Sequence, residues 1–285
     1  MFQPKNLAMI FTALLILFFA VFSANAQKLK VEDVVTKHLE AIGTAENRVN
    51  AKNYLFIGGA SFKIPTSPNP PIEGRAVFAS ESDKMLFGLA LNAVSYKQEQ
   101  IVYDGKKPKI GFITPGNRSP LGAFLAGDGD IIANGLLGGV LFKSWSLLNA
   151  PETKAKLNLD GTKKIKGVEC YVVDYNPRKG SDFAIKLYFD TQTFRHVRTE
   201  YKRTISARIG LKPDDSARQQ ETRHTLVEDF SDFKTVNNLT LPQNYSLLLN
   251  LTGQNGTSEY QWNINILEFL FNQKLDAGSF NVEAN

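Results

Sequence analysis

The side chains best suited to nucleophilic or metal chemistry are three histidines and one cysteine. His38, His196, His224 and Cys170 lie far apart in the sequence, and no zinc-protease, paired-cysteine, serine-hydrolase or phosphate-loop motif occurs. We interpret Cys170, which stands among apolar residues, as a small buried hydrophobe. His38 falls on an apolar helix face and is interpreted as a packed histidine, whereas His196 and His224 fall among arginines in strands and are interpreted as solvated. We expect no metal site and no cofactor.

A second group with catalytic potential is the acidic run Glu228, Asp229 and Asp232. Two carboxyl groups about 5–10 Å apart across a cleft can hydrolyse a glycosidic bond. Strand alternation places Glu228 and Asp229 on opposite faces, however, and no spacing selects a pair. We interpret these acids as surface residues beside a basic strand, and we expect no enzymatic activity.

Basic residues cluster along one predicted strand and the connection that follows it. A solvated hairpin accounts for this cluster, and a docking surface for an anionic partner or a membrane is the alternative. The formal net charge of +5 is too small and too scattered to indicate nucleic-acid binding. The cluster consists of Arg195, Arg198, Lys202, Arg203, Arg208 and Lys212.

The N-terminal segment has the pattern of a secretory signal peptide. Residues 7–22 are predominantly apolar, Lys5 precedes them, and the small-residue site Ala24-Asn25-Ala26 follows them. The apolar run is shorter than the roughly 20 residues that a membrane-spanning helix needs. We therefore predict cleavage after residue 26 and a soluble periplasmic product that forms a single domain over residues 27–285.

The predicted mature chain opens with an amphipathic helix over residues 31–43. Glu32 and Asp33 occupy its first turn, where acids suit the helix dipole, and Gly43 ends it. Such a helix needs an apolar surface to cover, so we expect a sheet beneath it. Its apolar stripe is Val31, Val34, Val35, His38, Leu39 and Ile42.

Most of the remaining chain is predicted to be β-structure, because apolar and polar residues alternate between turn-forming residues. Trp262 and Ile264, for example, alternate with Asn263 and Asn265, which predicts one dry and one wet face. The short connections predict antiparallel order. About eleven strands are expected, more than a flat sheet holds. The predicted fold class is therefore α+β, mostly antiparallel β, in a strongly curved, incomplete β-barrel.

Residues 119–149 interrupt the β-pattern. A serine followed by proline favours a helix start, and a break at residues 127–129 predicts two short helices. The second is apolar but contains Gly135, Gly138 and Gly139, and each glycine costs a helix about 0.5–1 kcal/mol relative to alanine. We expect this helix to depend on burial and to move, and we expect Gly138→Ala to make it more helical.

The predicted parts follow one another as signal segment, amphipathic helix, hairpins, apolar insertion and a long meander. The helix reads VEDVVTKHLEAIG from Val31, and the meander contains LYFDT from Leu187 and EDF from Glu228 and ends near residues 275–282. This order resembles the outer-membrane lipoprotein-sorting family, the LolA/LolB-like superfamily, over nearly the whole predicted mature chain.

The resemblance implies an incomplete barrel that wraps the N-terminal helix and a helical lid, with an apolar cavity for acyl chains between them. Burial of each methylene contributes about 0.8 kcal/mol, so the cavity must be dry and able to open. In the family an arginine inside the barrel bonds to the lid, and Arg75 is the candidate here. The predicted ligand-binding residues are Phe87, Leu89, Leu136, Leu137, Val140, Leu141, Trp145, Phe183, Ile185 and Leu187.

Two functions fit these expectations. The first is a periplasmic, monomeric binder or carrier of a lipoprotein acyl chain or another apolar ligand, with lipid or an acylated protein as its partner and with peripheral membrane contact. The alternative is a non-enzymatic envelope sensor or interaction module that binds a partner protein. Co-purified lipid would favour the first function, and a stoichiometric protein complex with an empty cavity would favour the second.

Overall fold

The computed structural model describes residues 29–127, 129–148, 155–177, 181–206, 221–254 and 256–282. The chain divides into two units, Met1–Lys30 and Val31–Asn285. The predicted signal segment 1–26 lies outside the described residues.

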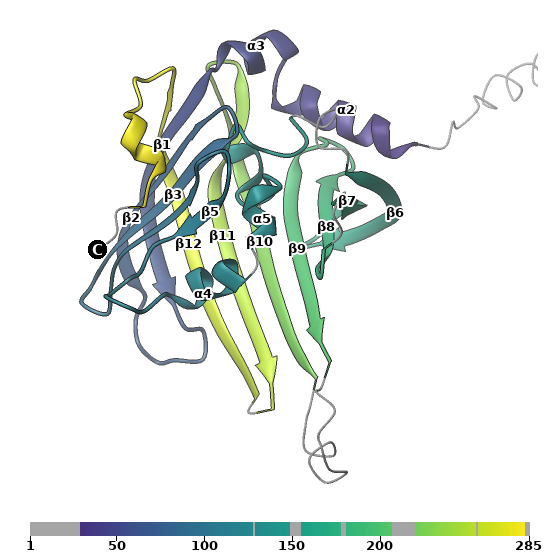
Figure 1. Cartoon of the computed structure of the whole chain (residues 1–285). Helices are drawn as coiled ribbons and strands as arrows, with labels where there is room; N and C mark the ends of the chain where they lie inside the picture. Colours follow the sequence, from purple (N-terminus) through teal and green to yellow (C-terminus); the bar gives the residue numbers. More distant parts are fainter. Residues whose placement is uncertain are drawn as a thin grey trace, which may run out of the picture. The chain divides into compact units, whose positions relative to one another are not determined.

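The described residues form one antiparallel sheet of twelve strands in the order β5-β4-β3-β2-β1-β12-β11-β10-β9-β8-β7-β6 (Figure 1). β1 pairs with β12 in the middle of the sheet, whereas β5 and β6 stand at opposite edges and leave the barrel open. The predicted strongly curved, incomplete barrel is thus confirmed. The strands are β1 Asn53–Lys63, β2 Ile72–Glu81, β3 Lys84–Ala93, β4 Tyr96–Tyr103, β5 Pro108–Ile110, β6 Lys156–Ile165, β7 Val168–Asn176, β8 Ala184–Asp190, β9 His196–Ile205, β10 Thr222–Val236, β11 Leu239–Gly253 and β12 Gly256–Phe271.

The period-two pattern gives the sheet a dry inner face. In β12, Trp262, Ile264 and Ile266 are buried, whereas Asn265 between them is exposed. Neighbouring strands keep the same parity, because Ile264 pairs with Tyr245 of β11 and both side chains are buried. The predicted wet and dry faces are confirmed.

The first helix, α2 Val31–Ile42, is followed by the short α3 Ala45–Asn50. Five residues of the predicted stripe are buried, and Leu39 is half-buried. Figure 1 shows α2 crossing one end of the curved sheet. The His38 ring lies 4.8 Å from the ring of Phe189, a buried residue of β8, so α2 covers the inner side of the sheet. No helix among the described residues has the length and apolar character that a membrane span requires.

The insertion, residues 119–148 without residue 128, contains α4 Pro120–Gly127, α5 Asp130–Ala133 and the 3-10 turn η1 Gly139–Leu141. α4 and α5 lie against the inner face of the sheet (Figure 1). Two short helices were predicted and two are present, but the second, α5, ends after one turn and does not continue toward residue 149; the chain runs through turns to residue 148 instead.

Glycine conformation explains the difference. Gly135, Gly138 and Gly139 have φ values of 63°, 73° and 50°, in the left-handed region that glycine tolerates and that a right-handed helix does not use. A Cβ atom at Gly138 would also collide with the ring of Phe142. The expectation that Gly138→Ala makes the insertion more helical is therefore wrong, and the substitution would strain this turn.

Two small apolar clusters cover parts of the outer face of the sheet. One joins Ala79 and Val102 to Phe280 of the C-terminal 3-10 turn η2 Ala277–Phe280. The other is built around Cys170 and Tyr188. Cys170 is fully buried, as predicted for a small hydrophobe, and burial raises the pKa of its thiol to about 11.

Candidate functional site: the closed interior

The ten predicted ligand-binding residues are all buried, with at most 6% of any of them exposed. Phe87 and Leu89 lie on β3, whereas Ile185 and Leu187 lie on β8, which belongs to the opposite half of the sheet. Phe183 directly precedes β8. The other five, which belong to the insertion, are Leu136, Leu137, Val140, Leu141 and Trp145. Their role in ligand binding stays a prediction.

The insertion fills the interior by packing on both halves of the sheet. Its Phe142 ring lies 5.5 Å from the ring of Phe78 on β2, and its Phe124 ring lies 5.5 Å from that of Phe183. A pocket of about 10 Å³ lies beneath α2, between His38, Val140 and His196. Side chains of the insertion therefore occupy space inside the curved sheet, and we call this arrangement the closed interior.

A buried carboxylate holds the middle of the insertion. Glu228 of β10 is fully buried, and its Oε1 accepts a hydrogen bond from the Gly138 backbone N–H (2.7 Å). Tyr245 donates to the same oxygen (2.5 Å), and Tyr201 donates to Oε2 (2.6 Å). Burial raises the pKa of Glu228 to about 7, although all three hydrogen bonds favour the charged form.

A second buried carboxylate holds the start of the insertion. Glu99 of β4, which is 1% exposed, accepts hydrogen bonds from Tyr96 and from the hydroxyl of Ser119 (2.5 Å). Ser119 in turn accepts from the Gly122 N–H (2.9 Å) and caps α4. Burial raises the pKa of Glu99 above its ordinary value. Two carboxylates from distant strands thus bind two points of one apolar insertion.

A histidine pair joins the insertion to α2 and β9. Trp145 Nε1–H donates to His38 Nε2 (3.3 Å), and His38 Nδ1–H donates to the Phe194 carbonyl (3.0 Å), so the His38 ring is used in its neutral form. The Trp145 ring stacks on His196 at 4.9 Å. Burial lowers the pKa of His38 to about 4 and that of His196 well below its ordinary value.

Several interpretations of single residues change with the structure. Arg75 is exposed, so it is not the cation inside the barrel, and the buried group that binds the insertion is the acid Glu228. The interpretation of Glu228 as a surface acid was wrong, although the predicted opposite faces of Glu228 and Asp229 are confirmed. His196 is 1% exposed and not solvated, whereas His224 is half-buried.

The alternation of inward and outward residues along β10 is the sequence signal that could have predicted a buried Glu228. It shares a strand face with Leu226 and Phe230, both of which are buried. Among the described residues, no group of three or more histidine, cysteine, aspartate or glutamate side chains is placed to hold a metal ion.

We expect the stability difference between wild type and Glu228→Gln to depend on pH. The carboxyl has a pKa of about 7 in the native state and about 4.3 when unfolded. Between these values the native state alone keeps the proton, so the free energy of unfolding of the wild type falls as pH rises. The glutamine of the variant does not titrate in this range. The free energy of unfolding of the variant, relative to that of wild type, should therefore rise by about 3 kcal/mol from pH 4.5 to 7.5.

Urea unfolding of both proteins across this pH range measures the effect. The buried His38 and His196 titrate in the opposite sense, since their native pKa values are lowered, but they are common to both proteins and cancel in the difference. A stability difference that stays constant with pH would contradict a buried, proton-binding Glu228.

A separate groove of about 680 Å³ lies on the outer face of the sheet. Asparagine and serine side chains line part of it: Asn244 pairs with Asn265, and Ser246 pairs with Asn263 across β11 and β12. The Asn265 amide donates to Asn244 Oδ1 (2.6 Å). The turn between β6 and β7, residues 165–168, contributes one wall.

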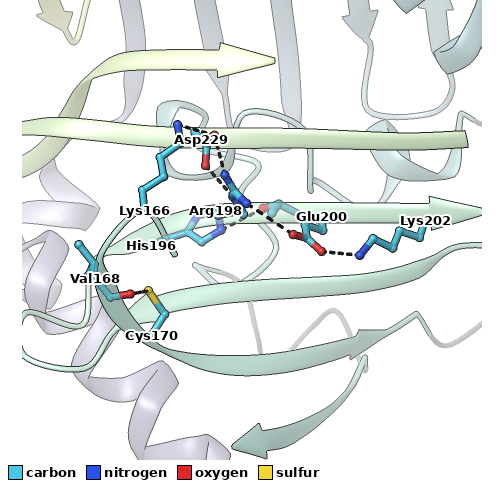
Figure 2. Close-up of polar contacts among 9 residues, drawn as sticks. Lys166, Val168, Cys170, His196, Arg198, Glu200, Lys202 and Asp229 are labelled. Atoms are coloured by element: carbon cyan, nitrogen blue, oxygen red, sulfur yellow. Dashed lines mark hydrogen bonds and ion pairs between the residues drawn. The ribbon is translucent and has the colours of Figure 1, made fainter. Parts of the chain in front are cut away.

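A chain of ion pairs runs beside this groove (Figure 2). Arg198 binds Asp229 through two hydrogen bonds of 2.7 and 3.0 Å, and Lys166 lies 3.0 Å from the same carboxylate. Glu200 connects Arg198 (3.6 Å) to Lys202 (2.9 Å). Arg198 and Lys202 of the predicted basic cluster are thus paired with acids. Arg208 and Lys212 lie outside the described residues.

Comparison with known proteins gives a likeness of structure and not of sequence. No protein-family model matches the chain, and no curated protein matches it. Among solved structures, a LolA superfamily protein from Nitrosomonas europaea has a TM-score of 0.50 and 11% identity, and the match covers 90% of this chain and 99% of that one.

Two more solved structures are similar at lower scores. A DUF1329 family protein from Desulfovibrio piger has a TM-score of 0.43 and 9% identity over 90% of this chain and 98% of that one. An outer membrane lipoprotein-sorting protein domain from Vibrio parahaemolyticus has a TM-score of 0.42 and 14% identity over 87% and 97%. The likeness to the LolA superfamily protein, at 11% identity, concerns the fold, and the predicted resemblance in fold is confirmed.

Proposed function

From the LolA-like fold of this chain, we propose that the protein binds or carries an apolar ligand, such as an acyl chain of a lipid or of an acylated protein, inside the curved sheet. This proposal rests on one observation. A separate apolar insertion, and not the strands alone, fills the interior of the curved sheet. A ligand that replaces the insertion finds dry walls on both halves of the sheet. Trp145, Leu137 and Phe142, each at most 1% exposed, mark the space that the ligand takes over.

Several polar contacts must break for the insertion to leave, among them the hydrogen bonds of Trp145 with His38, of Ser146 with Tyr175 and of Lys143 Nζ with the Arg48 carbonyl. They also include the hydrogen bonds of Glu228 with Gly138 and of Glu99 with Ser119, and the bond that the Lys143 N–H donates to Ser80 Oγ (2.9 Å). A net hydrogen bond contributes about 0.5–1.5 kcal/mol, whereas each methylene that a ligand buries returns about 0.8 kcal/mol. A long acyl chain therefore offsets the loss of these contacts.

The proposal extends to the setting of the protein. We place it in the periplasm, released from its signal segment after residue 26, as a monomeric carrier without enzymatic activity. Its partners are lipid or an acylated protein, and it reaches the ligand through peripheral contact with a membrane.

A reversible lock on the insertion tests this function. The backbone N–H of Lys143 donates to Ser80 Oγ (2.9 Å), so positions 80 and 143 are neighbours, and a cysteine pair there is the lock to test. In a Cys170→Ala background, the reduced S80C/K143C protein should take up the neutral apolar dye N-phenyl-1-naphthylamine and increase its fluorescence. The oxidised protein should take up at least about tenfold less dye, because the insertion cannot leave.

The same sample serves as its own control, since reduction must restore the uptake of dye. Equal uptake by the oxidised and reduced forms would place the dye outside the interior. No uptake by wild type under any condition would show that the insertion is permanent core, and the carrier function would then fail.

The outer groove favours a second candidate, a protein-interaction module. A groove of about 680 Å³ that is lined in part by asparagine amides offers apolar contact area, donors and acceptors to a polypeptide. Native mass spectrometry of the protein taken from its own envelope separates the two candidates. Bound lipid supports the carrier, whereas a stoichiometric protein complex whose interior holds no lipid supports the module.

A further inference from the structure

We propose that Glu228 selects the polar group of the ligand, and that the ligand class is an apolar chain bearing a hydrogen-bond donor, an amide N–H or a hydroxyl, near its head. This inference rests on the proposed carrier function. In the closed interior the backbone N–H of Gly138 occupies the position that the ligand's donor takes when the insertion leaves.

The surroundings of Glu228 consist of donors on an apolar wall. Oε1 accepts from Gly138 and Tyr245, and Oε2 accepts from Tyr201. No ion pair joins this carboxylate to a cation within the described ranges. Phe230, the next residue on the same face, is 2% exposed. The carboxylate therefore depends on its three hydrogen bonds, since a buried polar group without a partner is costly.

Only one of the three donors, the Gly138 N–H, belongs to the insertion, which leaves the interior in the proposed function. Tyr201 and Tyr245 stand on β9 and β11, the strands that flank β10 in the sheet, and they stay in place. Gly138 belongs to the insertion and departs with it. Oε1 then loses one donor while remaining inside the barrel, so a ligand that supplies an N–H or O–H there restores the network.

This geometry discriminates among ligands with the same chain. An alcohol or a primary amide replaces the Gly138 N–H. A methyl ester has no donor and leaves Oε1 with one partner fewer, which should weaken binding by about tenfold. A fatty-acid anion places a second carboxylate beside Glu228, and two neighbouring carboxylates resist joint ionisation. The anion should therefore bind more weakly than the ester at pH 8.

Competition against bound N-phenyl-1-naphthylamine tests the inference. Dodecanol, dodecanamide, methyl dodecanoate and dodecanoate share one chain length, and each is titrated at pH 8 against dye-loaded wild type, Glu228→Gln and Glu99→Gln. In wild type, the alcohol and the amide should displace the dye at concentrations at least about tenfold lower than the ester, and dodecanoate should be weakest.

The two variants separate selection from general damage. In Glu228→Gln the uncharged amide can donate to an ester or an acid, so the preference for the alcohol should shrink by about tenfold. Glu99→Gln alters the other buried carboxylate and should keep the wild-type order. Near-ultraviolet circular dichroism verifies that each variant is folded.

The experiment distinguishes a failure of the carrier function from a failure of the selection by Glu228. If wild type takes up no dye, the carrier function fails and the selection by Glu228 fails with it. If dye is taken up but all four competitors act equally on wild type, the carrier stands and the selection by Glu228 is wrong. An unchanged order of competitors in Glu228→Gln also overturns the inference.

Discussion

Replacing Trp145 by alanine should lower the free energy of unfolding by about 3–5 kcal/mol. Trp145 is fully buried, stacks on His196 at 4.9 Å and donates to His38, so it joins the insertion to β9 and to α2. Its removal leaves a cavity at the point where these three elements meet. Equilibrium urea unfolding, followed by far-ultraviolet circular dichroism, measures the loss.

Trp145→Phe is the matched variant. It keeps an aromatic ring against His196 but lacks the N–H donor to His38, so we expect a smaller loss of about 1–2 kcal/mol. A loss below about 1 kcal/mol for Trp145→Ala would contradict the closed interior, because it would mean that the insertion is not packed against the barrel in solution.

The faces of the sheet could be predicted from the sequence because strand parity is a local property. A shift of register by one residue would bury Asn263 and Asn265 and expose Trp262 and Ile264, so the pattern permits one arrangement. The same parity could have placed Glu228 on the inner face with Leu226 and Phe230. Residue type argued against burial, since an acid is seldom buried without partners, and its partners are distant in sequence and not visible in the pattern.

The turns of the insertion could not be predicted in the same way. Apolar residues spaced for a helix also suit a segment that fills a barrel, because such a segment is apolar on all sides. Whether Gly138 interrupts a helix or forms a left-handed turn depends on Phe142, and on the carboxylate of Glu228 that receives its N–H. These contacts form only when the sheet has brought β10 to the insertion.

Aspartate in place of Val34 should destabilise the domain by about 3–5 kcal/mol or prevent its folding, because the charge would be buried without a partner. Val34 is fully buried on the face of α2 that covers the inner side of the sheet. The helix itself tolerates aspartate, since Asp33 already stands in its first turn. The loss would therefore come from the contact between the helix and the sheet.

Thr36→Asp is the control, because Thr36 is exposed on the same helix and receives the same charge. It should change the free energy of unfolding by no more than about 0.5 kcal/mol. The melting temperatures of Val34→Asp and Thr36→Asp, measured under the same conditions, test this prediction. If both melt at the same temperature, α2 is not docked on the sheet, and the interior lacks the cover that His38 and Trp145 together provide.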